Sequence, residues 1–149
     1  MISIIKELET RTQKHPEKLL YSFLDIKGRV KESYTYQEFL VRVNSIASHL
    51  YSTQAFKPGD RALLVYPPGL EMICTFFACI KLGAIPVPVY PPSSKGFHAS
   101  ASIMGFIAKN CDAATVLTKT ASNRSISKFI NKGDPVTVIT NLNFSSMSL

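Results

Sequence analysis

The stretch VYPPGLEMICTFFACIKLGAIPVPVYPP, residues 65–92, contains the triplet Tyr-Pro-Pro twice, with Tyr66 and Tyr90 24 residues apart. Each triplet closes a short apolar run, and apolar residues at helical spacing lie between the two runs. Gly83 follows this helical pattern, and the prolines at positions 86 and 88 could not continue a helix. The stretch therefore predicts a strand, a helix and a second buried strand, and not one membrane-spanning helix over residues 72–89.

The same alternation continues along the chain and indicates the fold class. Apolar runs begin near residues 62, 84, 113 and 136, and intervals of about 20–30 residues are typical of βαβ units in a parallel sheet. We therefore expect an α/β fold with a layered parallel sheet. The predicted elements are parallel strands over residues 62–65, 85–89 and 114–117, helices over 69–82 and 102–110, a further helix over 121–131 and a strand over 135–140. Residues 141–149 show no clear period.

A short helix and a hairpin are expected to precede the sheet. Residues 3–13 have a helical pattern, and two strand-like segments, 18–25 and 29–36, lie on either side of a turn. The clearest helix begins after Thr35, whose side chain can cap the first turn in a capping box with Glu38. Its apolar stripe consists of Phe39, Val43, Ile46, Ala47 and Leu50.

The side chains between the triplets are expected to form core. Apolar spacing places Phe76, Phe77 and Ile80 there, and Cys74 and Cys79 in the same run are expected to be buried, unpaired thiols. Three cysteines without metal or disulfide spacing, and a first segment without a signal-peptide pattern, are typical of a reducing compartment, so a cytoplasmic location is expected. The three histidines have no metal spacing, and we assign no metal ligands.

The net charge of +7 is distributed unevenly along the chain. Residues 76–149 carry seven basic and only two acidic side chains. Over the whole chain the basic residues are scattered, except for the cluster KGRVK at positions 27–31. Scattered single charges disfavour a nucleic-acid-binding protein. A solvated face, or a surface for an anionic substrate or a missing partner domain, agrees better with this pattern.

The two triplets are expected at the carboxyl ends of parallel strands. A proline there cannot extend the ladder, because it lacks the N–H donor. Ligands bind at this edge in open α/β folds, so Tyr66, Gly69 and Tyr90 are candidates for a substrate-side rim. The alternative is that both tyrosines are packing residues beside rigid turns, and the residues by themselves favour that alternative.

Two segments resemble a known enzyme superfamily. SYTYQEFL, residues 33–40, resembles the first core motif of adenylate-forming enzymes, and IKLGAIPVPVYPP, residues 80–92, resembles their second. The paired Tyr-Pro-Pro triplets are most similar to those of fatty acyl-AMP ligases, over roughly residues 18–140. The resemblance implies an enzyme that uses ATP and Mg²⁺ to convert a fatty acid to acyl-AMP and passes the acyl group to an acyl carrier protein.

The chain also departs from the family pattern. The phosphate-binding loop of the family, rich in Ser, Thr and Gly and ending in Pro-Lys-Gly, has no counterpart, and no GxxxxGK[ST] pattern occurs. Residues 1–149 are therefore expected to form part of an N-terminal AMP-binding domain, without the ATP-binding portion or the small C-terminal domain and without activity alone. The alternatives are a non-catalytic module that binds an acyl chain or a partner polypeptide, and a truncated remnant.

Overall fold

The computed structural model describes residues 3–92, 97–118, 126 and 137–140 and has the predicted α/β fold. The main sheet has the strand order β4-β3-β5-β6, and every neighbouring pair is parallel. Its strands are β3 (Arg61–Val65), β4 (Ile85–Val89), β5 (Ala113–Thr118) and β6 (Thr137–Thr140). The three strands predicted over 62–65, 85–89 and 114–117 are confirmed, and β6 agrees with the strand predicted over 135–140.

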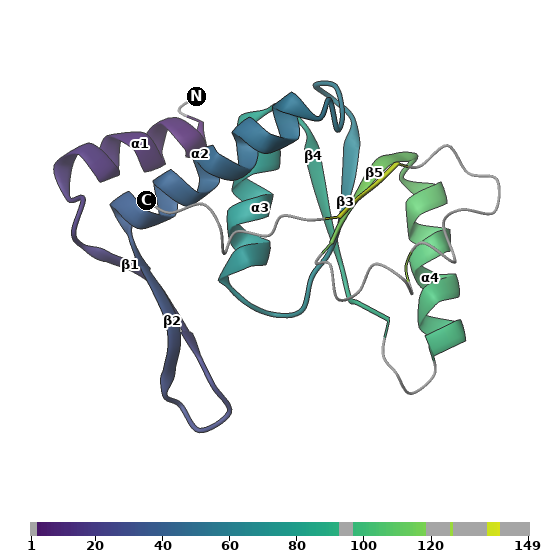
Figure 1. Ribbon diagram of the computed structural model, residues 1–149, viewed down its shortest axis with the longest axis horizontal. Helices are drawn as coiled ribbons and strands as arrows, with labels where there is room; N and C mark the ends of the chain where they lie inside the picture. Colours follow the sequence, from purple (N-terminus) through teal and green to yellow (C-terminus); the bar gives the residue numbers. More distant parts are fainter. Residues whose placement is uncertain (1–2, 93–96, 119–125, 127–136, 141–149) are drawn as a thin grey trace.

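In the described part of the chain, helices lie on both sides of the sheet (Figure 1). They are α1 (Ile4–Lys14), α2 (Tyr36–Ser52), α3 (Leu70–Lys81) and α4 (Phe97–Asn110). Helix α1 packs on α2 and α3, away from the sheet. Successive side chains of a strand point to opposite faces, so Leu64 of β3 packs toward α2 and α3, whereas Leu63 and Val65 pack with Met104 of α4. The sheet is therefore covered on both faces, which explains why its strands are continuous apolar runs.

Helix α3 ends within one residue of the predicted end, and only part of its predicted core set is fully buried. Its fully buried residues are Leu70, Cys74, Thr75, Ala78 and Cys79. The prediction of core residues overstated the burial of three side chains. The structure leaves Phe76, Phe77 and Ile80 half-buried. The helix is apolar on nearly all sides because α2 and the sheet pack against different faces of it (Figure 1). The prediction that Cys74 and Cys79 are buried and unpaired is confirmed.

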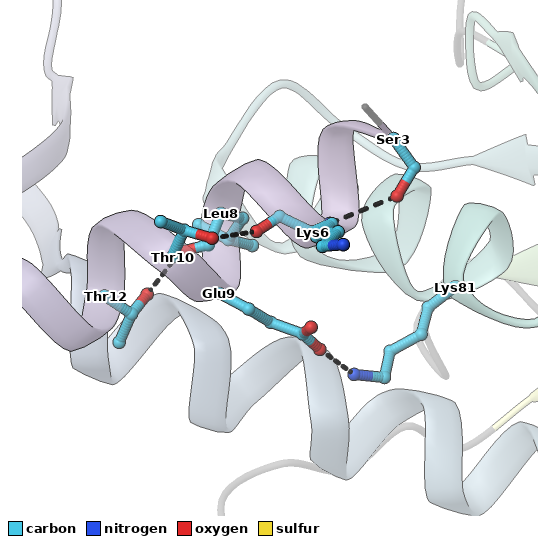
Figure 2. A network of polar contacts seen from close by, with 7 residues as sticks. All are labelled: Ser3, Lys6, Leu8, Glu9, Thr10, Thr12 and Lys81. Carbon is cyan, nitrogen blue, oxygen red and sulfur yellow. Dashed lines mark hydrogen bonds and ion pairs between the residues drawn. The ribbon is translucent and has the colours of Figure 1, made fainter. Parts of the chain in front are cut away.

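The amino-terminal helices are anchored by local polar contacts. The Thr35 hydroxyl accepts from the Glu38 N–H, and the Glu38 carboxylate accepts from the Thr35 N–H, so the capping box is confirmed. Helix α1 is capped by Ser3 and buries Leu8 and Thr12 (Figure 2). Its Glu9 carboxylate lies 2.8 Å from the Lys81 ammonium, which joins α1 to the end of α3.

A hairpin of β1 (Leu19–Leu24) and β2 (Val30–Thr35) forms a separate two-stranded sheet. It extends from the helices at the lower left of Figure 1 and confirms the predicted hairpin. Its inner end is anchored where the Tyr21 ring meets the Phe39 ring of α2, with centroids 5.1 Å apart. The outer end carries the KGRVK cluster.

Two predictions fall on residues outside the described ranges. The helix predicted over 121–131 lies there except for Ile126, which is buried with the α4 side of the core. The expectation for residues 141–149 also lies outside. Among the helices that the structure describes, none has the length and apolar character needed to cross a bilayer.

Candidate functional site

The two Tyr-Pro-Pro triplets lie side by side at the carboxyl edge of the sheet. Strands β3 and β4 pair in parallel from Arg61 opposite Ile85 to Val65 opposite Val89. The register offset is therefore the same 24 residues that separate Tyr66 from Tyr90, and each tyrosine is the next residue after its paired strand. Because paired residues of parallel strands point to the same face, the repeat along the chain brings two tyrosines to one edge.

A hollow of about 210 Å³ opens at this edge, on the α3 side of the sheet. Tyr66 and Tyr90 both line it, together with Leu64, Pro68, Met72, Pro88, Val89 and Pro91. Apart from the two phenol groups, these side chains are apolar and uncharged. A lining of this kind fits the end of an apolar ligand.

Tyr66 contributes its ring to the hollow and buries its hydroxyl beneath α3. The residue is 4% exposed, and among the described residues the hydroxyl has no hydrogen-bond partner within bonding geometry. Burial raises the pKa of the Tyr66 phenol well above its usual range, and the nearby Thr75 hydroxyl offsets part of this effect. That Thr75 hydroxyl donates to the Glu71 carbonyl at 2.9 Å. The Tyr66 phenol is therefore buried and neutral, while the residue still lines the hollow.

Tyr90 has the opposite environment, because it is 85% exposed. It stands between the first hollow and a second one of about 320 Å³ on the α4 side of the sheet. The second hollow is lined by Val89, Tyr90, Pro91, Ser100, Ile103, Met104 and Ile107. An exposed aromatic side chain shared by two apolar hollows is placed to contact a bound molecule in either one.

Gly69 belongs to a third hollow, of about 390 Å³, between the hairpin and the start of α3. It is the N-cap residue of α3, in extended backbone, with open space where a Cβ would lie. The chain bends at Pro68 and Gly69 before the helix begins. This hollow has the only charged lining of the three hollows discussed, namely Lys31, Glu32 and Glu71.

Sequence reasoning identified the edge but missed several residues that line it. Met72 of α3 and Pro88 of β4 both line the first hollow, and Ile103 of α4 lines the second. A signal was available for Pro88, because a residue two positions before Tyr90 lies on the same face of a strand. Nothing in the chain up to residue 92 signals that Ile103 returns to this edge.

The edge fits an apolar group better than a phosphate or a metal ion. Within the described part of the chain, no group of three His, Cys, Asp or Glu side chains is placed to hold a metal ion. The first hollow has no charged lining residue. Phosphates and Mg²⁺ require oxygen ligands, cations or clustered N–H donors, and the residues of this hollow do not supply them.

Comparison with known proteins agrees with this picture. The model of the family described as "AMP-binding enzyme" matches residues 8–148. A fatty acid AMP ligase of known structure from Legionella pneumophila is 30% identical, with a TM-score of 0.74, over 97% of this chain and 25% of its own. The FadD32 long-chain-fatty-acid–AMP ligase of Mycolicibacterium smegmatis is 30% identical over 85% of this chain and 20% of its own length.

The similarity extends to another group of proteins. Disco-interacting protein 2 of Drosophila melanogaster is 30% identical over 74% of this chain and 6% of its own length. The chain thus spans a quarter or less of each of these relatives. The resemblance to fatty acyl-AMP ligases, read from the paired Tyr-Pro-Pro triplets of residues 66–92, is confirmed.

Proposed function

Because the chain belongs to the AMP-binding enzyme family, we propose that it forms the amino-terminal part of the adenylation domain of a fatty acyl-AMP ligase. The observation that carries the proposal is the apolar hollow at the carboxyl edge, between Tyr66 and Tyr90. The match over residues 8–148 and the 30% identity to two fatty acid–AMP ligases support it.

The proposed reaction joins a fatty acid to AMP. A fatty acid carboxylate oxygen attacks the α-phosphorus of ATP, a new acyl–phosphate bond forms, and pyrophosphate leaves. The acyl group then passes to the thiol of an acyl carrier protein, and AMP is released. ATP and Mg²⁺ are the cofactors of the complete enzyme, and the apolar lining described above means that other parts of that enzyme hold them.

The residues of this chain supply a wall for the acyl chain. Met72 and Pro88 present apolar surface to the first hollow, and the buried Tyr66 ring closes its base. Removal of a fatty acid tail from water into such a lining is favourable by about 25 cal/mol per Å² of apolar surface. Tyr90, exposed at the rim, is placed to direct the tail toward one of the two hollows.

In this proposal residues 1–149 are part of an AMP-binding domain and are inactive alone, and further chain supplies the ATP-binding portion and the small C-terminal domain. The fatty acid and the acyl carrier protein are the partners of the complete enzyme. Three free cysteines support a reducing, cytoplasmic location.

A tryptophan at the rim tests the acyl wall. The chain contains no tryptophan, so Tyr90→Trp introduces a single reporter at the hollow, and Tyr51→Trp introduces a matched one at an exposed tyrosine at the end of α2. Titration with dodecanoate below its micelle concentration should shift the emission of Tyr90→Trp to the blue and saturate, while Tyr51→Trp stays unchanged. Equal responses of both variants, or no response of Tyr90→Trp, would contradict the acyl wall.

A non-catalytic acyl-binding module is the second candidate. One observation favours it: the first hollow has an apolar lining without a charged residue. The two candidate functions differ in how the Tyr90→Trp titration with dodecanoate should respond when a C-terminal portion of a ligase is added. If a supplied C-terminal portion of a ligase leaves dodecanoate affinity unchanged and gives no pyrophosphate release, the module is favoured.

A further inference from the structure

The outer end of the hairpin combines exposed aliphatic and basic side chains at one projecting point. We define the hairpin tip as Leu24, Ile26, Lys27, Arg29, Val30 and Lys31. We propose that the hairpin tip docks the protein on an anionic lipid surface, with the aliphatic side chains entering the interface and the basic ones meeting the head groups. This inference goes beyond the proposed ligase function and does not rest on it.

The turn at the hairpin tip is held in one shape. Asp25 Oδ1 accepts from the N–H of Lys27 at 2.8 Å and from the N–H of Arg29 at 3.0 Å. Asp25 Oδ2 lies 2.8 Å from an Arg29 guanidinium nitrogen. A turn tied to one carboxylate by two N–H groups and a guanidinium presents its side chains with little further loss of conformational freedom on binding.

The aliphatic side chains of the tip are exposed to an unusual degree. Ile26 is fully exposed, and Val30 and Leu24 are 63% and 50% exposed. Leu24 and Val30 are paired across the two strands, so they lie next to each other. Three aliphatic side chains gathered at a projecting end form an apolar point without a cavity, which suits a deformable apolar phase.

The charge of the tip is complementary to anionic lipids. Residues 24–32 contain three basic side chains, Lys27, Arg29 and Lys31, and two acidic ones, Asp25 and Glu32. Arg29 is paired with Asp25, and the segment keeps a net charge of +1. Basic residues at an anionic membrane surface are attracted over about one Debye length. The basic residues and the apolar point therefore match the two layers of one surface, the head groups and the start of the acyl chains.

A folded protein or a nucleic acid is a poorer match for the tip. A stable protein–protein interface uses roughly 20–30 residues a side, many more than the six of the tip. Nucleic acid would be recognised through the basic residues alone and gives Ile26 no role. Anchoring of the inner end of the hairpin through Tyr21 and Phe39 leaves the tip as the outermost part of this element (Figure 1).

Vesicle cosedimentation of the 149-residue chain tests the proposal. The chain should sediment with vesicles of phosphatidylcholine and phosphatidylglycerol and not with vesicles of phosphatidylcholine alone. Ile26→Asp should weaken the partition coefficient by about tenfold or more, and the double variant Lys27→Glu/Lys31→Glu should do the same. Raising salt from about 0.1 M to about 1 M should weaken binding of the unaltered chain, since the Debye length falls from about 10 Å to about 3 Å.

Matched variants elsewhere on the surface control for charge and apolarity. Phe106→Asp removes an aromatic residue of α4 that is 70% exposed, and Lys57→Glu reverses an exposed charge in another turn. Both should bind vesicles like the unaltered chain, and all variants should keep the same circular dichroism spectrum. Equal binding to both vesicle types, or an equal loss of binding in the control variants, would overturn the proposal. Binding to poly-glutamate or duplex DNA that Ile26→Asp leaves unchanged would also overturn it.

Discussion

Phe39 of α2 meets Phe77 of α3 edge to face, with ring centroids 5.2 Å apart and ring planes at 82°. Tyr21 of β1 also contacts the Phe39 ring, so this one side chain joins the hairpin, α2 and α3. Phe39 is fully buried, whereas Phe76, the residue directly before Phe77 in α3, is half-buried. Aromatic pairs of this geometry add to the free energy gained from burial alone.

Replacement of these two phenylalanines should therefore have unequal costs. Phe39→Ala should lower the free energy of unfolding by about 3–5 kcal/mol, while Phe76→Ala should cost clearly less because its ring keeps contact with water. Urea unfolding followed by circular dichroism measures both. An equal loss for the two variants would contradict the burial described for α3.

The capping box of α2 predicts a second, smaller effect. Thr35→Ala removes the acceptor that the Glu38 N–H uses at 3.2 Å and should cost about 1 kcal/mol of stability. Gln37→Ala, an exposed position in the same turn, is the matched control and should change stability by less than about 0.5 kcal/mol. If both substitutions cost the same in urea unfolding, the cap does not stabilise this helix.

The sheet, the helices and the hairpin could be predicted because their signals are local. Each signal concerns the backbone of one turn or one strand: an apolar run indicates a strand, Gly83 the end of a helix, and the Thr35–Glu38 pair the start of one. The burial of Cys74 and Cys79 could be predicted, but the partial exposure of Phe76, Phe77 and Ile80 could not, because nearly all positions of α3 are apolar and the spacing cannot show which side faces the sheet. Cys74 and Ala78 face inward in place of the larger Phe76 and Ile80.

The candidate site was predictable in place but not in detail. Identical triplets have opposite environments, because Tyr66 follows the central strand β3 beneath α3, whereas Tyr90 follows the edge strand β4. That difference depends on strand order, which is not a local property of either triplet. The contribution of Ile103 to the second hollow depends on the packing of α4 and is equally non-local.

Among the described strands, β4 lies at the edge of the sheet, and removal of its prolines should increase self-association. The Ile85 N–H donates to the Asp60 carbonyl at 2.8 Å, so alternate residues of β4 bond toward β3 and the N positions of Pro86 and Pro88 point to the open edge. That edge offers no N–H donor at these two positions, which opposes strand addition. The double variant Pro86→Val/Pro88→Val should therefore have a larger oligomer fraction in sedimentation velocity than the unaltered chain. Unchanged association of the double variant would contradict this role of the prolines.

The buried thiols predict a selective alkylation pattern. Burial raises the pKa of both Cys74 and Cys79 to about 12, so at pH about 8 both remain protonated and shielded from reagent. Cys111 is half-exposed. Iodoacetamide should add once to the folded chain, at Cys111, and at all three cysteines in urea, as read by mass spectrometry. Rapid labelling of Cys74 in the folded chain would mean that α3 does not bury it.

The central claim, that this chain builds part of a fatty acid-activating domain, is tested most directly by pyrophosphate release from a chimera. In the chimera, residues 8–148 replace the matching segment of a homologous fatty acyl-AMP ligase, and the control lacks the segment. We expect release that depends on both ATP and a fatty acid from the chimera, and none from the control or from the 149-residue chain alone. Release by the chain alone, or a folded chimera that releases no pyrophosphate with any fatty acid, would contradict the account.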